Sequence, residues 1–239
     1  MARRLRLDIP GVPWHIVQRG NNRSDCFLIE RDYHCYLDML TEFAEKQRCA
    51  VHAYVLMTNH VHLLVSPEDL SSGSILMKLL GQRYVQYFNR MHQRSGTLWE
   101  GRFHSCLTQS EEYLLTCYRY IELNPGRAGI VDHPRAYRWS SYRCNAEGEP
   151  DVLVTPHAEF SRLGATEADR HQAYRGLFAD HLDPARIDEI RRSTNGNAAL
   201  GSSAFQARIG QILGPRAMRG RPGRRRQVPE QANGQLDLR

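Results

Sequence analysis

Two histidines, His60 and His62, lie two residues apart in an apolar segment that runs from Val55 to Val65. The segment is rich in β-branched residues, which is typical of a buried strand, and alternate side chains of a strand share one face. Both imidazoles would then point the same way. A neutral imidazole is a common ligand for divalent metals, and a rigid strand leaves the pair little ordering entropy to lose. The spacing alone also fits two hydrogen-bonded histidines of the core.

Tyr120 and Asn124 are four residues apart in a segment with helical periodicity, so they share a helix face if the helix reaches that far. A phenol hydroxyl can attack phosphorus and form a phosphotyrosine, which conserves the energy of the phosphodiester bond. A metal held by the two histidines and a side-chain oxygen would polarise that phosphate. The same two residues also fit ordinary roles, in which Tyr120 packs in the core and Asn124 caps a turn begun by Pro125.

The elements predicted around these residues must bring them together. Apolar periodicity predicts strands over 14–19, 49–56 and the histidine segment, amphipathic helices over 30–48, 74–91 and about 110–124, and an extended segment over 97–107. A short turn at 57–59 pairs the second strand with the histidine strand. Ser110 is expected to cap the third helix. Strands separated by packed helices predict an α+β fold, a ferredoxin-like antiparallel sheet with packed helices.

The 239 residues include 41% hydrophobic residues, which is enough for a sizeable core. A stretch rich in polar and turn-forming residues, Asn145 to Pro150, is typical of a boundary. We therefore predict a core domain over 1–145, a helical C-terminal region over 146–213 and a flexible arginine-rich tail over 214–239. The formal net charge is +6. The excess comes from six arginines in a short span without a carboxylate: Arg216, Arg219, Arg221, Arg224, Arg225 and Arg226.

Several classes of protein and site do not fit the sequence. Six scattered cysteines without a Cys-x-x-Cys pair argue against a thiolate zinc cage and against a disulfide framework. No apolar run approaches the roughly 20 residues of a spanning helix, so we expect a cytoplasmic protein without a membrane partner. The chain has no GxxxxGK phosphate loop, which fits chemistry without nucleotide hydrolysis.

The ordered motifs resemble those of the single-tyrosine HUH transposases, specifically the REP-associated tyrosine transposases of bacteria. The resemblance rests on His60-Val61-His62 and on Tyr120-Ile121-Glu122-Leu123-Asn124-Pro125. Further matches are Arg19–Arg23, Thr58–His62, Trp99–Phe103 and Arg127–Gly129. It covers residues 1 to about 145 strongly, and 200–205 and 219–222 more weakly. Gly126 departs from the pattern, because the family more often has a bulkier apolar residue there, and this puts the local turn in doubt.

The resemblance implies a metal-dependent endonuclease and strand transferase that acts on single-stranded DNA in transposition. Residues 1–145 would be the catalytic domain, with Tyr120 as nucleophile and His60, His62 and Asn124 around Mg²⁺ or Mn²⁺. The reaction would pass through a 5′-phosphotyrosine, after recognition of a REP-type hairpin. We expect Arg19, Arg23, Arg102 and the six tail arginines to bind the DNA, as a monomer or a homodimer.

Other functions leave different marks on a sequence. A two-histidine phosphodiesterase would need a second His-x-Thr/Ser motif, and a zinc hydrolase a third strong ligand; we find neither. Acidic residues near His104 keep this class open as an alternative. A DNA-binding regulator that no longer mobilises DNA would show a broken nucleophile or ligand, whereas these positions are intact. HUH replication initiators and relaxases stay open as alternatives, although the sequence around Tyr120 favours a transposase.

Overall fold

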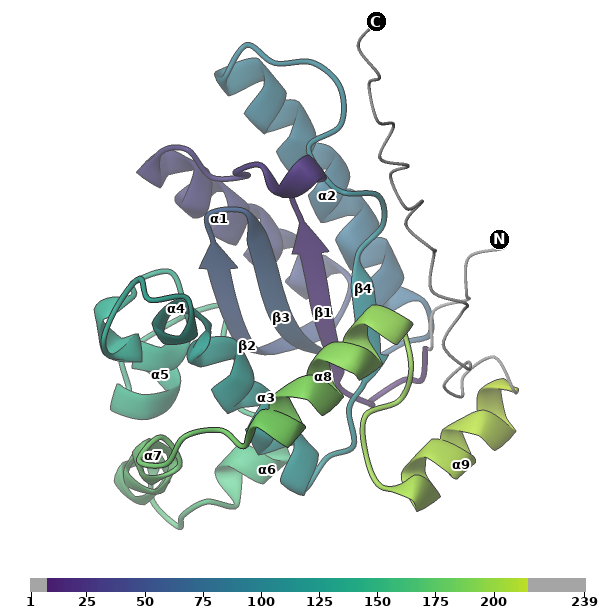
Figure 1. The fold of residues 1–239 in the computed structure, drawn as a ribbon, viewed down its shortest axis with the longest axis vertical. Helices are drawn as coiled ribbons and strands as arrows, with labels where there is room; N and C mark the ends of the chain where they lie inside the picture. Colours follow the sequence, from purple (N-terminus) through teal and green to yellow (C-terminus); the bar gives the residue numbers. More distant parts are fainter. Residues whose placement is uncertain (1–7, 215–239) are drawn as a thin grey trace, which may run out of the picture.

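The computed structural model describes residues 8–214 and contains the predicted α+β fold. The first half of the chain forms β1 (Trp14–Arg19), α1 (Glu30–Lys46), β2 (Cys49–Met57), β3 (His60–Pro67), α2 (Ser72–Met91) and β4 (His104–Leu107). These elements build one four-stranded sheet in the order β2-β3-β1-β4, and all neighbouring strands are antiparallel (Figure 1). This βαββαβ arrangement confirms the predicted ferredoxin-like fold.

The centre of the sheet is the pairing of β1 with β3. Val17 lies opposite His62, and Arg19 lies opposite His60. On the other side of β3, Met57 of β2 pairs with His60, so the hairpin turn consists of only two residues, Thr58 and Asn59. The turn is therefore one residue shorter than predicted, because Met57 stays in the ladder.

The segment after β1 holds the tip of this hairpin. The Gly20 amide donates to the Asn59 carbonyl at 2.8 Å, and the Cys26 amide donates to the Thr58 carbonyl at 2.8 Å. A side chain at Gly20 could not be accommodated, because its Cβ would lie 2.1 Å from the Ser24 carbonyl oxygen. A short 3₁₀ turn, η1 (Asn21–Arg23), follows this glycine. The start of β3 is thus fixed from two directions.

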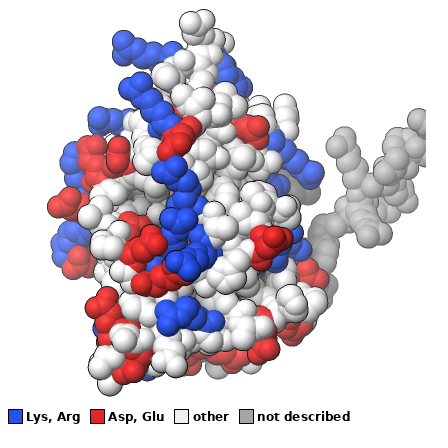
Figure 2. Space-filling view, turned by 90° about the vertical axis from the view of Figure 1, so that its left-hand side faces the viewer, with Lys and Arg blue, Asp and Glu red and all other residues white. Residues whose placement is uncertain are grey.

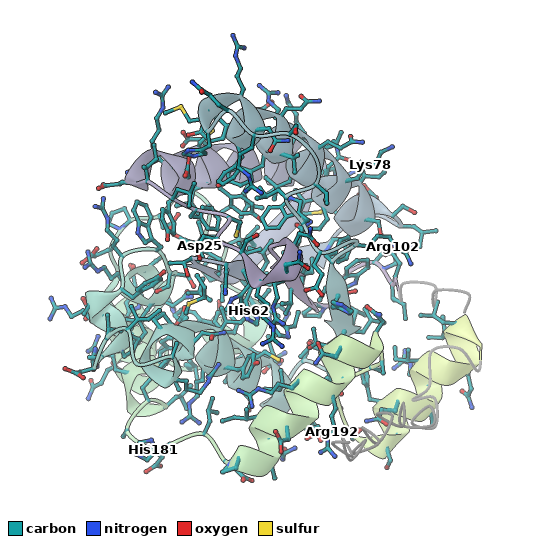
Figure 3. The ribbon with its side chains drawn as sticks, turned by 45° about the horizontal axis from the view of Figure 1, so that its top comes forward. Asp25, His62, Lys78, Arg102, His181 and Arg192 are labelled. Carbon is teal, nitrogen blue, oxygen red and sulfur yellow. The ribbon has the colours of Figure 1, made fainter. Side chains whose placement is uncertain are left out.

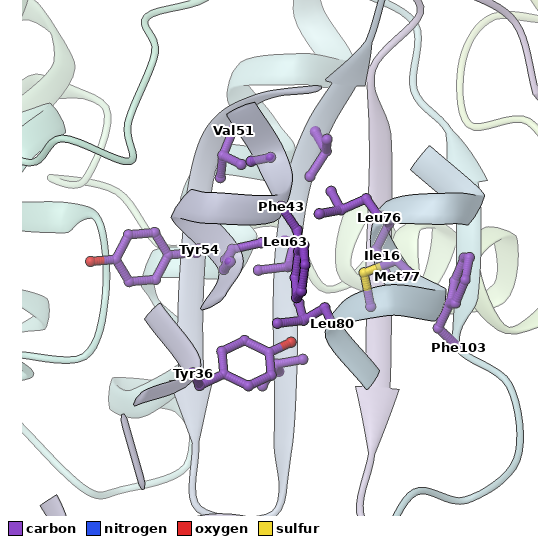
Figure 4. Packing of buried hydrophobic residues seen from close by; sticks show 14 of the residues in the cluster. Ile16, Tyr36, Phe43, Val51, Tyr54, Leu63, Leu76, Met77, Leu80 and Phe103 are labelled. Carbon is purple, nitrogen blue, oxygen red and sulfur yellow. The ribbon is translucent and has the colours of Figure 1, made fainter. Parts of the chain in front are cut away.

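One face of the sheet packs against α1 and α2. Its core is apolar and rich in aromatic rings, as Figure 4 shows for ten labelled residues: Ile16, Tyr36, Phe43, Val51, Tyr54, Leu63, Leu76, Met77, Leu80 and Phe103. Each large side chain that is fully buried in this way contributes roughly 1.5–3 kcal/mol relative to an exposed one. This layer supplies a rigid support for the strands.

The second half of the chain is helical: α3 (Glu112–Glu122), α4 (Asn124–Arg127), α5 (Tyr142–Glu147), α6 (Ala158–Ser161), α7 (Glu167–Gly176), α8 (Pro184–Gly196) and α9 (Ser203–Leu213), with a 3₁₀ turn η2 (Pro134–Ala136). Helices α3 and α8 cover the opposite face of the sheet, whereas Ile209 of α9 belongs to the apolar cluster of the first face. Figure 1 shows α3 and α8 crossing in front of the sheet, with α8 beside β4. Within 146–213, α8 therefore packs on the sheet, and α6 and α7 pack on α3 and α5, respectively.

The third helix differs from its prediction at both ends. Glu111 adopts φ +64°, so the helix starts at Glu112 and the predicted Ser110 cap does not form. It ends at Glu122, and Asn124 begins the separate short helix α4. Pro125 lies in the first turn of α4, because its ring nitrogen has no hydrogen to continue the ladder of α3.

Other departures are smaller. The extended segment 97–107 forms a strand only over β4, and Gly101 at φ +68° bends the chain before it. The first helix ends at Lys46, two residues early, and the second starts at Ser72. The six cysteines are free. Among residues 8–214, no helix has the length and apolar character to cross a membrane.

Candidate active site on the histidine face of the sheet

Strand β3 and helix α3 bring two histidines and a tyrosine together. The His60 and His62 rings share a face of the sheet, with centroids 5.1 Å apart. The Tyr120 ring meets His62 edge to face, with centroids 5.7 Å apart. His62 is 5% exposed and lies near the centre of the molecule in Figure 3. Three of the four predicted chemical residues therefore lie in one cluster.

A third histidine, His15, joins the cluster from β1, and sequence reasoning did not single it out. Its ring stacks on His62 with centroids 5.2 Å apart, and its Nε2 lies 2.9 Å from His62 Nδ1. The Tyr120 ring is 5.6 Å away. The alternating pattern of β1 predicts which side chains share a face with His15, but only the register between β1 and β3 shows that His62 lies on the same face.

All three imidazoles are neutral near pH 7. Burial lowers the pKa of His15 to about 3 and the pKa of His60 to about 4, with smaller contributions from Arg127 and Arg19 respectively. Burial also holds the pKa of His62 well below its usual range. Metal ions bind the neutral form of histidine, so these rings need not lose a proton before binding one.

The hydrogen bonds of Asn59 identify the free nitrogen of His60. The Asn59 Nδ2 donates to the Arg23 carbonyl at 3.2 Å, which turns its Oδ1 toward His60. That oxygen lies 2.6 Å from His60 Nδ1 and can only accept. In the neutral ring, the lone pair is then on Nε2, and metal-binding histidines commonly show this pattern.

Tyr120 is held by Arg127, another residue that the sequence reasoning did not assign to the site. The guanidinium carbon lies 4.3 Å from the centre of the Tyr120 ring, and Nη2 donates to the Tyr120 carbonyl at 2.8 Å. Burial lowers the pKa of Arg127 to about 10, which leaves it cationic at neutral pH. The sequence spacing could have indicated this contact, because Tyr120 and Arg127 are seven residues apart, which is about two helical turns.

The Tyr120 ring is buried, but its hydroxyl is available. The residue is 6% exposed overall. The hydroxyls of Tyr36 and Tyr118 are buried without a partner, whereas that of Tyr120 is not among such atoms and makes no hydrogen bond with residues 8–214. A substrate could therefore reach the oxygen without first displacing a protein partner.

Asn124 lies one turn beyond Tyr120, half-buried at the start of α4. Its side chain makes no hydrogen bond to any described residue, so the structure does not join it to the imidazoles. Within residues 8–214, no three His, Cys, Asp or Glu side chains are close enough to hold a metal ion. Two imidazoles fit part of a divalent-metal shell, and the remaining ligands would have to be oxygens such as an amide, water or phosphate.

The predicted DNA-binding arginines fall in three places. Arg19 and Arg23 are exposed beside the hairpin tip, close to His60. Arg102 instead lines a cavity of about 860 Å³ next to α2, together with Lys78, and both lie toward the edge in Figure 3. No carboxylate of the described chain pairs with these three arginines. The six tail arginines lie outside the described residues.

The surface of the described chain is not uniformly basic. On the face in Figure 2, Lys and Arg side chains lie among Asp and Glu side chains. The described chain also contains ion pairs, such as Arg138 with Glu30 at 2.6 Å and Arg135 with Glu147 at 3.0 Å. Exposed pairs of this kind contribute little to stability and partly cancel the positive charge.

Comparison with known proteins identifies the family. A family model described as IS200-like transposase matches residues 9–124. A Haemophilus influenzae protein, provisionally named a REP-associated tyrosine transposase, is 26% identical over 129 residues, covering 47% of this chain and 73% of that protein.

Two solved structures are also similar. The structure of a REP-associated tyrosine transposase bound to a REP hairpin has a TM-score of 0.50 at 18% identity, covers 66% of this chain and 93% of that chain, and shows the same fold. A provisionally named Deinococcus radiodurans transposase matches at 21% identity over 51% of this chain and 95% of that chain, but its TM-score of 0.35 is too low to support an argument. The family predicted from the motifs is thus confirmed: residues 9–124 belong to the IS200-like transposases, and the chain is similar to the REP-associated tyrosine transposases among them.

Proposed function

We propose that this transposase cuts single-stranded DNA beside a hairpin and rejoins it through a covalent bond to Tyr120. The observation that carries the proposal is the position of the Tyr120 ring, 5.7 Å from the His62 ring and with its hydroxyl free. A buried tyrosine with an available hydroxyl beside neutral imidazoles fits a nucleophile better than a packing residue. Tyr118, which is fully buried on the same helix, shows the packing role.

In the proposed reaction, the Tyr120 oxygen attacks the phosphorus of a phosphodiester. A bond forms between that oxygen and phosphorus, and the bond from phosphorus to the 3′ oxygen breaks. The phenol proton passes to solvent, and the leaving 3′ oxygen takes up a proton from solvent. The product is a 5′-phosphotyrosine and a free 3′ hydroxyl. The reverse attack by a 3′ hydroxyl on the phosphotyrosine restores a phosphodiester, so no nucleotide needs to be hydrolysed.

The surrounding residues would prepare this attack. His60 and His62, with Asn124 as a third candidate ligand, would hold Mg²⁺ or Mn²⁺, which supplies Lewis-acid polarisation of the phosphate when bound. Arg127 fixes the Tyr120 ring and places a positive charge beside it, which favours negative charge on the phenol oxygen in the transition state.

A relative in this family was solved bound to a REP hairpin, and we propose a hairpin of that type as the substrate here. Arg19 and Arg23 lie beside the active site and would position the cleaved strand. Arg102 and the tail arginines would hold phosphates farther away. Residues 1–145 would act as the catalytic domain, 146–213 as a supporting helical region and 214–239 as a DNA-binding arm, in a monomer or homodimer.

The test uses a hairpin oligonucleotide with its flanking single strand, taken from short inverted repeats near the gene. His62→Ala should lose cleavage and keep hairpin binding. His52→Ala is the matched control, because His52 is also buried in the sheet but bonds to Ser66 and the Thr155 carbonyl. Undiminished cleavage by His62→Ala, or by the wild type in excess chelator, would contradict the proposal. Binding without cleavage by the wild type would indicate a DNA-binding regulator.

A further inference from the structure

A line of buried hydrogen bonds runs from His62 to helix α8. His62 Nδ1 lies 2.9 Å from His15 Nε2, and His15 Nδ1 lies 2.9 Å from Thr194 Oγ1. The Thr194 hydroxyl donates to the Ile190 carbonyl one turn earlier in α8, at 2.9 Å. Cys106 Sγ is a further neighbour of that hydroxyl, at 3.3 Å. Residues from β3, β1 and α8 are therefore linked in series.

The end of this line determines the direction of every bond in it. The Thr194 hydroxyl donates to the Ile190 carbonyl, and with its single hydrogen used there, Thr194 Oγ1 accepts from His15. His15 then carries its hydrogen on Nδ1. A neutral imidazole has one such hydrogen, so His15 Nε2 accepts, and His62 must donate from Nδ1. The lone pair of His62 is left on Nε2.

Both rings are in the neutral form that this reasoning requires. His15 is 1% exposed and His62 is 5% exposed, and no carboxylate is hydrogen-bonded to either. Along this line, His15 bonds to His62 and Thr194, and His62 bonds to His15, so neither ring has an acid as its hydrogen-bonding neighbour.

We propose that His15 and Thr194 are positioning residues that fix the His62 tautomer, so that its Nε2 lone pair is available to a divalent metal. The proposal rests on the proposed function, because it assumes that His62 is a metal ligand. The hydrogen bond to Asn59 fixes the tautomer of His60 in the same way and leaves its Nε2 free as well. The two ligands are thus prepared by different parts of the chain, one by the hairpin turn and one by α8.

The consequence is that α8, in the C-terminal region, completes the metal site. Thr194 is 132 residues from His62 in the sequence, yet it is 2% exposed against His15. Outer partners of this kind commonly change metal affinity by about 10–100-fold when they are removed. A metal site made by residues 1–145 alone would lack this partner.

Thr194→Val tests the direction of the bonds with little change in shape. Valine has no oxygen, so His15 Nδ1–H would be left without an acceptor in a buried position. His15 would instead carry its hydrogen on Nε2 and donate to His62 Nδ1. The hydrogen of His62 would then move to Nε2, which blocks the nitrogen needed for the metal.

The first measurement is the tautomer of His62 in the full-length, metal-free protein, read from the ¹⁵N chemical shifts of its ring. We expect hydrogen on Nδ1 in the wild type and in Thr194→Ser, which keeps the hydroxyl, and hydrogen on Nε2 in Thr194→Val. Thr108→Val is the matched control. Thr108 is buried nearby, but among residues 8–214 its hydroxyl bonds only to cysteine sulfurs, at 3.9–4.0 Å, so this change should leave the tautomer as in the wild type.

The second measurement is a calorimetric titration of the same proteins with Mn²⁺ alone. Thr194→Val should bind about 10–100-fold more weakly than the wild type, Thr194→Ser and Thr108→Val. Wild-type His62 with its hydrogen on Nε2 would overturn the proposal even if Thr194→Val fails to fold. So would equal Mn²⁺ affinity in Thr194→Val and the wild type. If the wild type shows the expected tautomer but neither binds Mn²⁺ nor cuts DNA, the proposed function fails instead.

Discussion

The two faces of the sheet use the same strands for different purposes. On β3, Val61, Leu63 and Val65 point into the apolar core under α1 and α2, whereas His60 and His62 point toward α3 and α8. The first face gains stability from packing apolar surface. The second holds buried polar groups, which would cost free energy if they were not hydrogen-bonded. Alternation along a strand thus separates the residues that stabilise the fold from those proposed to perform chemistry.

Buried polar groups occur on both faces, but with different partners. Under α1, the Asp32 carboxylate accepts hydrogen bonds from the Leu28 amide at 2.8 Å and from the Tyr87 hydroxyl and His92 at 3.0 Å. On the other face, His15 and His62 bond to each other with no carboxylate between them. A carboxylate stabilises charge locally, while a line of neutral groups keeps a lone pair free for a ligand.

The largest effects on stability and cleavage are expected from substitutions of two adjacent residues that lie on opposite faces of the sheet. Leu63→Ala should lower the free energy of unfolding by about 2–5 kcal/mol, because Leu63 is fully buried in the core. Cleavage per folded molecule should be unchanged. His62→Ala should lose cleavage with a smaller loss of stability. Urea denaturation and cleavage assays on both proteins would check this. If the two variants lost the same amount of stability and the same amount of cleavage, the two faces would not have the different roles described here.

Glu122 provides a pH test within the helical layer on the chemical side. Its fully buried carboxyl accepts from Ser141 and Tyr174 at 2.6 Å, and burial raises its pKa to about 7. Between pH 4.5 and 7 the unfolded chain ionises this group before the folded chain does. The contribution of Glu122 to stability is therefore full below pH 4.5 and lost as pH rises to 7, in total roughly 3 kcal/mol.

Glu122→Gln should remove that part of the pH dependence. Glu45→Gln, at an exposed site of α1, makes the same change in charge and serves as the control. Urea unfolding at several pH values between 4.5 and 8 measures the difference. If Glu122→Gln and the wild type keep the same slope with pH, the carboxyl does not titrate as described.

Arg127→Lys should slow cleavage by a moderate factor. Lysine keeps the charge but cannot both lie flat on the Tyr120 ring and reach its carbonyl. A stacked cation of this kind contributes about 0.5–2 kcal/mol, which predicts a rate lower by roughly 2–30-fold. Arg119→Lys on α3 is the control, since Arg119 bonds to the Asp180 carbonyl instead. Equal rates for the two variants would argue against a role for Arg127.

The smallest effect on stability or chemistry is expected from the tail, residues 214–239. Deletion of residues 214–239 should leave stability and cleavage of bound DNA unchanged and weaken DNA binding. With about 0.7 per phosphate contact and six arginines, the slope of log affinity against log salt should flatten by roughly 4. An unchanged slope would show that the tail does not touch DNA, and faster cleavage would indicate inhibition by the tail.

The sequence was sufficient for most strands and helices of the first half of the chain and for the local spacing of the site. Strong periodicity located the strands and helices, and the two-residue spacing placed His60 and His62 on one face. The sequence could not reveal that His15 and Thr194 lie near His62, because their positions depend on the strand register and on how α8 packs against β4. The end of α3 was also missed by two residues, since Asn124 and Pro125 begin a new short helix rather than a loop.

The most direct test of the proposed function is a denaturing gel of the protein after incubation with a labelled hairpin oligonucleotide and Mn²⁺. The wild type should form a covalent adduct that carries the DNA segment with the 5′ phosphate. Tyr113→Phe, a change on the same helix, should form it too, and Tyr120→Phe should not, although it still binds the hairpin. An adduct that persists in Tyr120→Phe would contradict Tyr120 as the nucleophile. So would the absence of an adduct when the wild type is incubated with every hairpin that it binds.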